Sequence, residues 1–196
     1  MKNNARNFVK RKNLFTKFIP RLVESFGEDP QREGLNETPG RVLRMYEELL
    51  SGYSKNPSSV FKTFKNDGYK DLVTVANINF YSLCEHHLIP FFGKVHIGYV
   101  PNGRILGFSK FARLVDVYAR RLQTQENLTK QIFDSIQSNL HPKACIVRIE
   151  AEHLCVNMRG IKKKDFITKT TVSDNGMRKN GYLTNQFYKD IESNKI

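Results

Sequence analysis

The stretch Cys145-Ile-Val-Arg-Ile-Glu-Ala-Glu-His-Leu-Cys155 decides the fold class, because its side chains alternate between two kinds. The odd positions from 145 to 151 are apolar or Cys, whereas the even positions 148, 150 and 152 are charged. Successive side chains of a strand point to opposite faces of a sheet, so this pattern predicts a strand with one face in the core. The same period carries His153 and Cys155 onto the core-side face, at the carboxyl end of the strand. Two metal-capable side chains where an apolar face ends indicate a site rather than simple packing.

Further strands and helices are predicted on both sides of this stretch. Alternating or β-branched sequence predicts strands at about 72–82, 93–99, 105–108 and 164–172, the last pairing with 144–155. Apolar residues at helical spacing predict two consecutive helices, at 109–122 and 125–140. Two helices inserted between hairpins of an antiparallel sheet indicate an α+β fold.

The N-terminal part is predicted to be helical after a basic arm. An amphipathic stretch from Leu14 to Phe26 contains Pro20, which should delay or bend its helix. A second helix should use Thr38 as its N-cap, with Pro39 at the first helical position, and end at Gly52. We therefore expect four parts: a flexible basic arm (1–19), a helical segment (20–60), the main domain (61–185) and a C-terminal tail (186–196).

Charge is distributed unevenly along the 196 residues. The chain has 32 basic and 19 acidic side chains, a net charge of +13, which indicates an anionic partner. Residues 1–23 carry seven basic side chains and no acidic one, while residues 24–160 are nearly balanced. Basic residues gathered at chain ends are typical of solvated tails.

Composition and cysteine content predict a cytoplasmic protein. No apolar run approaches the roughly 20 residues of a membrane helix, and residues 1–12 lack the apolar stretch of a secretory signal. We therefore expect the three cysteines (Cys84, Cys145 and Cys155) to be thiols in a reducing compartment.

The run Cys84-Glu85-His86-His87 is a second group of metal-capable side chains. Alone it is equally consistent with a buried cysteine beside surface histidines. Together with His153 and Cys155 it predicts a zinc site, because zinc prefers thiolate and imidazole ligands. Cys84, Cys155 and one histidine would leave a position for water, as catalytic zinc does, whereas a second histidine would close the site. In the open case the spare histidines are available as general acid or base.

The segment Gly107-Phe-Ser-Lys-Phe-Ala-Arg113 predicts an anion site. With Ser109 as N-cap, Lys110 and Arg113 fall in the first helical turn, where cations oppose the helix dipole. A bound polyphosphate would reverse that cost, since free N–H groups and both cations would face it.

Other charged residues carry less information on spacing alone. Glu126 and Lys130 are four apart, which favours a surface ion pair. Arg41 and Arg159 stand out by no pattern, and Lys162-Lys-Lys164 is typical of a solvated turn.

Four motifs taken together resemble the GTP cyclohydrolase I family: Ser82-Leu-Cys-Glu-His-His-Leu-Ile-Pro90, Gly107-Phe-Ser-Lys110, Arg120-Arg-Leu-Gln-Thr-Gln-Glu126, and Glu150-Ala-Glu-His-Leu-Cys155 followed by Arg159-Gly160. With Gly27–Leu35, Thr38-Pro39 and Arg41, the resemblance covers roughly residues 20–172. It implies the tunnelling fold (T-fold), an α+β architecture with two helices inserted in an antiparallel sheet. It also implies a homodecamer of two stacked pentamers with sites between subunits.

The resemblance implies conversion of GTP and water to 7,8-dihydroneopterin triphosphate and formate. This is the first step of pterin biosynthesis, leading to tetrahydrofolate or tetrahydrobiopterin, and a deazaguanine pathway is a further use of the product. The implied steps are attack of zinc-activated water on purine C8, ring opening, deformylation and rearrangement of the ribose. We expect GTP, rather than nucleic acid or a membrane, to be the anionic partner. Allosteric control is compatible with the family, and no regulatory protein is indicated.

The resemblance also implies a role for each site residue. Cys84, His87 and Cys155 match the ligands of Zn2+, and His86 and His153 match the catalytic proton-transferring histidines. Gln125 and Glu126 match the residues that hold guanine, which replaces the ion-pair interpretation of Glu126. The remaining matches hold the triphosphate: Arg41, Ser109, Lys110, Arg113 and Arg159.

The sequence departs from the family pattern at two places, and three other interpretations remain open. Asn127 stands where arginine is common, and the sequence after Val172 leaves the usual ending. A nitrile reductase of queuosine synthesis shares the fold, but its signature is absent and the Cys/His set argues against it. The rival from another class is a structural zinc module that binds nucleic acid through the basic ends, and a catalytically dead homologue is a third alternative.

Overall fold

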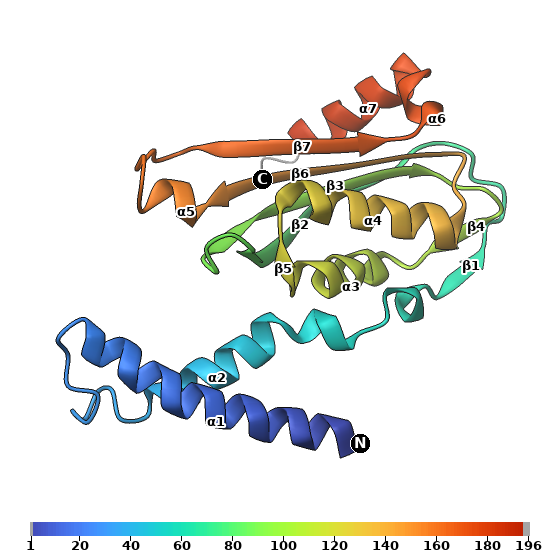
Figure 1. The fold of residues 1–196 in the computed structure, drawn as a ribbon. Coiled ribbons are helices and arrows are strands. Elements are labelled where there is room, and N and C mark those ends of the chain that lie inside the picture. Colours follow the sequence, from blue (N-terminus) through green and yellow to red (C-terminus); the bar gives the residue numbers. More distant parts are fainter. Residues whose placement is uncertain (1, 194–196) are drawn as a thin grey trace. The chain divides into compact units, whose positions relative to one another are not determined.

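The computed structural model describes residues 2–193, with side chains from residue 7, and the chain forms two compact units, 1–51 and 52–196 (Figure 1). In the first unit, helix α1 (Lys2–Ser25) packs along helix α2 (Thr38–Leu49). Ile19 and Leu43 are buried between them, and the rings of Phe15 and Tyr46 lie 5.9 Å apart. This packing stabilises both helices.

The N-terminal helices differ from prediction at their starts. Helix α1 begins at Lys2 and continues through Pro20, where we expected an irregular arm and a later start. Packing of the neighbouring Ile19 on α2 offsets the hydrogen bond that proline cannot donate. The N-cap of α2 is Glu37 rather than Thr38, so Pro39 stands one position later than predicted.

The second unit contains a five-stranded sheet in the order β5-β2-β3-β6-β7. All neighbouring strands are antiparallel except β5, which pairs in parallel with β2. The strands are β2 (Val73–Cys84), β3 (Pro90–Val100), β5 (Leu122–Gln123), β6 (Ala144–His153) and β7 (Ile167–Ser173). A separate small pair joins β1 (Thr63–Lys65) to β4 (Arg104–Leu106).

Two helices cover one face of this sheet, α3 (Phe108–Ala119) and α4 (Gln125–Leu140). The alternating side chains of β6 predicted this arrangement: Cys145, Val147, Ile149 and Ala151 all lie in the core beneath the helices. Short helices connect or follow the strands, namely the 3-10 turns η1 (Ser51–Ser54) and η2 (Pro57–Val60), and α5 (Leu154–Asn157). The predicted α+β class is confirmed, and β6 pairs with β7 as expected. The strand ends at His153, however, so Cys155 lies in α5 and not on the strand where we predicted it.

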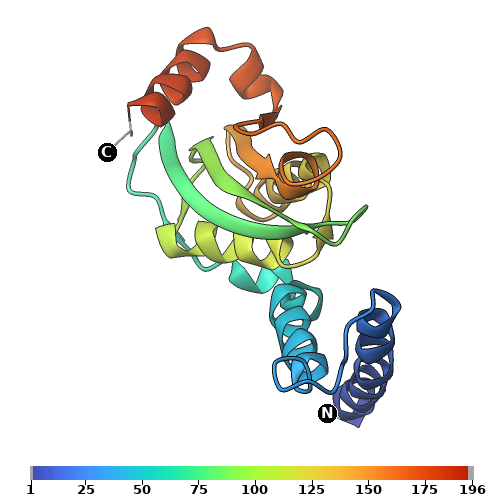
Figure 2. The same cartoon turned by 90° about the vertical axis from the view of Figure 1, so that its left-hand side faces the viewer.

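The C-terminal residues form helices where we expected a tail from residue 186. After α6 (Asn175–Arg178), helix α7 (Gly181–Glu192) packs on the sheet face opposite α3, as Figure 2 shows. Phe187 is fully buried against Val100 and Ile146. A Cβ at Gly98 would lie 2.7 Å from the Phe187 ring, so the glycine makes room for it. The apolar residues of α7 therefore extend the folded unit to residue 192. No helix in the described part of the chain has the length and apolar character needed to cross a membrane.

Candidate active site

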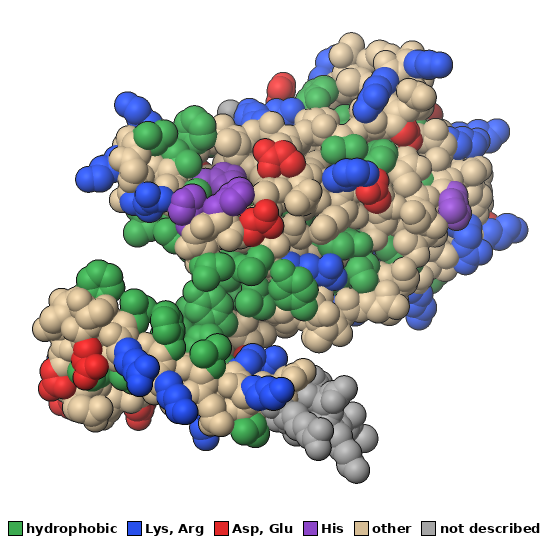
Figure 3. Space-filling model, in the orientation of Figure 1, with side chains coloured by type: hydrophobic (Ala, Val, Ile, Leu, Met, Phe, Trp, Pro, Cys, Tyr) green, Lys and Arg blue, Asp and Glu red, His purple; other side chains and the backbone are tan. Residues whose placement is uncertain are grey.

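The three predicted metal ligands converge at the carboxyl ends of β2 and β6. The ligand atoms of Cys84, His87 and Cys155 all lie within 4.8 Å of one another. Cys84 is buried, Cys155 is half-buried and His87 is exposed, so the group opens towards solvent on one side. Figure 3 shows histidine side chains together on the surface at this end of the unit. The sequence prediction of one ligand set from two distant motifs agrees with this geometry.

Tight backbone turns hold the first two ligands in place. Cys84 is the last residue of β2, and its backbone carbonyl accepts hydrogen bonds from the N–H groups of His87 (3.3 Å) and Leu88 (2.8 Å). Leu88 has a φ of 55°, which closes this turn before β3 begins. Strand β5 adds a second restraint, because Gln123 pairs with Cys84 and accepts the Glu85 N–H at 3.0 Å. The cysteine and histidine are thus fixed by both neighbours of β2.

The electrostatics of the two thiols fit a cation. Burial raises the pKa of the Cys155 thiol, and the neighbouring Cys84 raises it further. A divalent ion at this position would favour the thiolate form of Cys155 and so oppose both effects. A Cys, His, Cys set is the donor chemistry that zinc prefers, and three ligands leave one position open.

His86 and His153 flank the three-residue group. The Nδ1 atom of His86 lies 3.8 Å from the Cys84 Sγ, and its ring is 6.2 Å from that of His87. His153 is the last residue of β6 and stacks on Phe91 of β3, with centroids 4.6 Å apart and planes 5° apart. Burial lowers the pKa of His153, and the negative charge of Glu126 partly opposes this.

Gln125 and Glu126 begin helix α4 beside His153. Thr124 caps the helix by accepting the Asn127 N–H at 3.2 Å. The Gln125 side chain is buried, and its Oε1 lies 2.9 Å from His153 Nε2. Glu126 is exposed, and its expected surface partner Lys130 pairs instead with Asp134 at 2.6 Å. The ion-pair interpretation of Glu126 is therefore wrong.

The predicted anion-binding residues lie at the other end of helix α3. The N-cap of α3 is Gly107, not Ser109, because Gly107 is extended and its carbonyl accepts the Lys110 N–H at 2.8 Å. Ser109 and Lys110 therefore belong to the first turn, whereas Arg113 follows one turn later. Figure 1 shows that α3 runs from β4 to β5, so its first turn and the metal-ligand group lie at opposite ends of a helix about 18 Å long.

The two remaining arginines fall in different places. Arg159 follows α5, and its positive charge acts to lower the pKa of Cys155, so it lies near the metal-ligand group. Arg41 belongs to α2 in the 1–51 unit, where its side chain is exposed and pairs with Glu37 at 2.9 Å. One chain thus brings together the ligands, both histidines, Gln125, Glu126 and Arg159.

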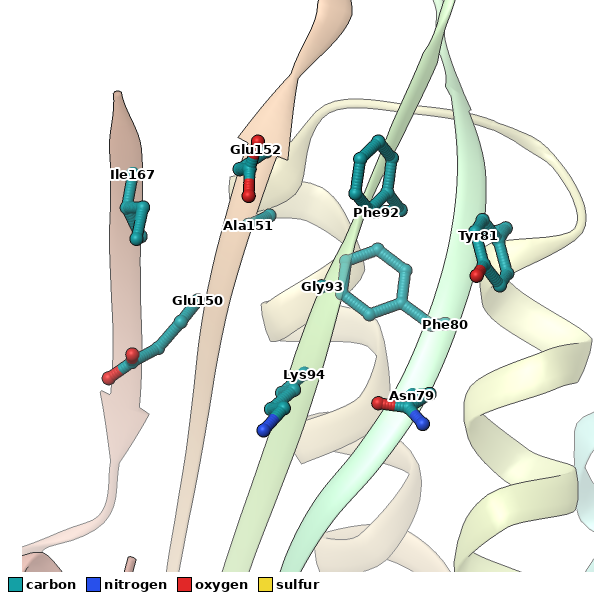
Figure 4. A pocket seen from close by; sticks show the side chains of 10 residues that line it. All are labelled: Asn79, Phe80, Tyr81, Phe92, Gly93, Lys94, Glu150, Ala151, Glu152 and Ile167. Carbon is teal, nitrogen blue, oxygen red and sulfur yellow. The ribbon is translucent and has the colours of Figure 1, made fainter. Parts of the chain in front are cut away.

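A hollow of about 450 Å³ lies on the sheet face away from α3 and α4 (Figure 4). Its lining combines aromatic and apolar side chains with charged ones, among them Tyr81, Phe92, Lys94, Glu150 and Ile167. None of the predicted site residues is among the described residues that line it. The hollow is therefore a feature separate from the metal-ligand group.

Sequence reasoning missed the residues that surround His153 and Gln125. Phe91, Thr168 and Thr170 come from β3 and β7, and each contacts His153 or Gln125. The β-branched run at 164–172 indicated a strand next to β6, but period alone does not tell which threonine meets which glutamine. These contacts depend on the register of the sheet.

Comparisons with known proteins identify the family of the chain. A family model described as GTP cyclohydrolase I matches residues 15–192. A GTP cyclohydrolase 1 from Brucella suis is 54% identical over 147 residues, covering 74% of this chain and 69% of that one. The one from Brucella anthropi is 51% identical over 156 residues, covering 79% and 73%. A crystal structure of the archaeosine synthase QueF-Like in the apo form aligns with a TM-score of 0.45 and 17% identity, over 53% of this chain and 93% of that one.

The family match spans more than half of the chain and includes every motif on which the resemblance rests. The family match therefore confirms the predicted tunnelling fold. The chain therefore belongs to the GTP cyclohydrolase I family.

Proposed function

We propose that the chain converts GTP to 7,8-dihydroneopterin triphosphate and formate at a Zn2+ site formed by Cys84, His87 and Cys155. Family membership makes the chain an enzyme with GTP as its substrate. The observation that carries the zinc proposal is the convergence of three ligand atoms within 4.8 Å from two separate strands. A bound zinc ion supplies Lewis acidity, which makes water a nucleophile near neutral pH.

The residues around the ligands suit proton transfer to a purine. His153 is half-buried and stacked on Phe91, so its ring is held in one orientation. His86 is exposed beside Cys84, on the open side of the group. We assign His153 and His86 to donating and accepting the protons that ring opening and hydrolysis require.

Glu126 is the acceptor we assign to the guanine N–H edge. Its carboxylate is exposed in the first turn of α4, and its charge reaches His153. A carboxylate accepts hydrogen bonds, so Glu126 can accept from the N–H groups of the guanine edge. Arg159, next to Cys155, is available to the substrate phosphates.

The phosphate-binding residues support a site shared between subunits. Ser109, Lys110 and Arg113 belong to the half of α3 that begins far from the ligands of the same chain. A GTP molecule with its purine at the metal therefore requires these residues from a second copy. This supports the homo-oligomer expected for the family, a decamer of two pentamers, with Arg41 as a further phosphate contact.

The setting of the enzyme is proposed from its thiols and its product. Cys84, Cys145 and Cys155 are free, as expected in the reducing cytoplasm. The product would enter pterin biosynthesis for tetrahydrofolate or tetrahydrobiopterin.

The direct test is incubation of the zinc-loaded protein with GTP, followed by oxidation and detection of a fluorescent pterin together with formate. Metal-stripped protein should form neither product, and added zinc should restore both. Formation of neither by zinc-loaded, folded protein would contradict the proposal. Cobalt substitution tests the structural-zinc rival, because a complete protein ligand set without exchangeable water would favour that rival.

A further inference from the structure

The buried amide of Gln125 has its orientation fixed by backbone carbonyls. Its Nε2 lies 3.1 Å from the Ile149 carbonyl oxygen and 3.2 Å from that of Thr168. Carbonyl oxygens only accept hydrogen bonds, so the nitrogen, and not the oxygen, of the amide must face them. The amide oxygen therefore points to the other side, towards His153 and the Thr168 hydroxyl.

A chain of threonine hydroxyls requires the same orientation. Thr129 Oγ1 donates to the Gln125 backbone carbonyl at 2.7 Å, which uses its single hydrogen. In the 2.6 Å contact between Thr129 and Thr170, the Thr170 hydroxyl must then be the donor. The Thr170 oxygen remains free to accept from Gln125 Nε2 at 3.1 Å. The hydrogen bonds thus run from the Gln125 amide to Thr170, from Thr170 to Thr129, and from Thr129 back to the Gln125 carbonyl. The amide nitrogen has no hydrogen left for another partner.

The orientation of the amide determines the tautomer of His153. Gln125 Oε1 is an acceptor 2.9 Å from His153 Nε2, so that ring nitrogen carries a hydrogen. In the neutral imidazole the lone pair then lies on Nδ1. Stacking on Phe91 fixes the plane of the ring, so the direction of that lone pair is fixed as well.

We propose that Gln125 is a positioning residue for His153: it holds the Nε2–H tautomer and leaves Nδ1 to exchange protons with the substrate. This inference rests on the catalytic role proposed above for His153. It replaces the guanine contact that the resemblance implied for the Gln125 side chain, because both amide hydrogens and the oxygen are already used within the chain. A neutral acceptor in this position stabilises one tautomer without adding a charge to the site.

Three roles for Gln125 predict different results for Gln125→Met, which keeps the size of the side chain and removes the amide. A positioning role predicts a kcat lower by about 10–100-fold with KM for GTP within about twofold of wild type. A guanine contact predicts mainly a higher KM. A purely structural role predicts a lower Tm with kcat changed no more than in a matched control.

The matched control is Thr170→Val. It removes a hydroxyl from the same ring and leaves the Gln125 oxygen and His153 untouched. We expect a Tm loss comparable to that of Gln125→Met, with kcat within about twofold of wild type and the zinc content of both variants unchanged. A kcat for Gln125→Met no lower than that of Thr170→Val, or a changed KM with unchanged kcat, would overturn the proposal.

The tautomer itself is measured by NMR on zinc-loaded protein labelled with 15N in the histidine rings. The His153 signals are identified by their loss in His153→Ala. Wild type and Thr170→Val should show the Nε2–H form, and Gln125→Met should lose this preference. An Nδ1–H form in wild type overturns the proposal even if Gln125→Met fails to fold. If wild type does not turn over GTP, the proposed function fails, while this measurement still decides the tautomer.

Discussion

The two ends of strand β6 each have a cysteine, and the surroundings of the two thiols differ. Near the amino end, Cys145 is fully buried, and burial raises the pKa of its thiol far above the usual range, with the charge of Asp174 acting in the same direction. Just past the carboxyl end, Cys155 is half-buried and lies beside Cys84 and His87. The same residue type thus fills the core where its neighbours are apolar and can bind a cation where other ligand atoms converge.

Different neighbours produce these two environments. At the amino end, α6 and α7 cover the face that α3 and α4 leave open, and Met177 and Phe187 complete an apolar cluster. At the carboxyl end, the strand passes directly into the short helix α5, and polar groups of Gln125 and His153 replace apolar contacts. The two ends of one strand therefore differ: the amino end is packed with apolar side chains, and the carboxyl end carries the proposed metal-ligand group.

The largest expected effect comes from exchanging the two cysteines for alanine in turn. Cys155→Ala should lose bound zinc and lower GTP turnover by about 1,000-fold or more, because a lost Lewis acid forfeits several kcal/mol of transition-state stabilisation. Cys145→Ala should keep one zinc per chain and lose about 1–2 kcal/mol of unfolding free energy. Metal analysis and denaturant unfolding measure both. Zinc retained at one per chain in Cys155→Ala would refute the ligand assignment.

A histidine near each end of β6 allows the same comparison. His153→Ala should keep zinc and lower kcat by about 10²–10⁴-fold, the contribution typical of a general acid or base. His141, exposed at the C-cap of α4 just before β6, is the control. His141→Ala should leave kcat unchanged. Steady-state kinetics check both, and an unchanged kcat in His153→Ala would remove its proposed role.

A substitution at the packed end should act on stability alone. Phe187→Ala empties a fully buried site between α7 and the sheet and should cost about 3–5 kcal/mol of unfolding free energy. At a temperature where the variant remains folded, zinc content and kcat should match wild type. Denaturant unfolding and a turnover assay measure the two properties. Loss of zinc from folded Phe187→Ala would show that the two ends of β6 are coupled.

The start of α3 tests whether catalytic function is confined to the carboxyl end of β6, because it lies away from the metal-ligand group yet is proposed to bind phosphate. Lys110→Ala should raise KM for GTP by about tenfold, the loss of one charge-assisted phosphate contact, with a smaller change in kcat. Arg104, which bonds to Thr63 in β1, is a nearby control whose substitution should leave KM unchanged. An unaffected KM in Lys110→Ala would end the phosphate assignment.

The smallest expected effect is the pH dependence of the free energy of unfolding, which arises from His96 and Glu150 near the middle of β3 and β6. Burial lowers the pKa of His96, whose Nδ1 accepts the Asn77 N–H at 3.3 Å. Burial alone would raise the pKa of Glu150, but Arg148 and Lys169 lower it overall. Both groups bind protons more readily when unfolded, so the free energy of unfolding should fall as the pH drops below about 6.5, and again through the carboxylate range. His96→Gln should flatten the first decline in pH-dependent unfolding; an unchanged profile would contradict this source.

Sequence periodicity predicted the regular parts of the fold. The alternation around Val147 and Ile149 placed β6 and its core face correctly, and apolar spacing gave α4 its observed start at Gln125. The donor types of Cys84, Cys155 and the nearby histidines predicted a shared metal site, whereas the choice of His87 as the third ligand came from the family resemblance.

Features that depend on contacts between distant residues were not predictable. The cap of α3 fell on Gly107 because its backbone is extended there, although serine is the stronger capping residue. Helix α7 is held by the burial of Phe187 rather than by its own sequence pattern. The orientation of the Gln125 amide depends on the backbone carbonyls of Ile149 and Thr168, which lie 24 and 43 residues away in the chain.

Strand β5 has only two residues, yet it determines where this chain tolerates changes in length. Gln123 pairs with Cys84, and two residues later Gln125 bonds to His153. An insertion or deletion between Ala119 and Gln125 would move one of these contacts out of register, so chain length there should be fixed across working variants. The exposed turn at Asn102 and Gly103 carries no such contact with the site and is the place where a loop could be lengthened or a tag inserted.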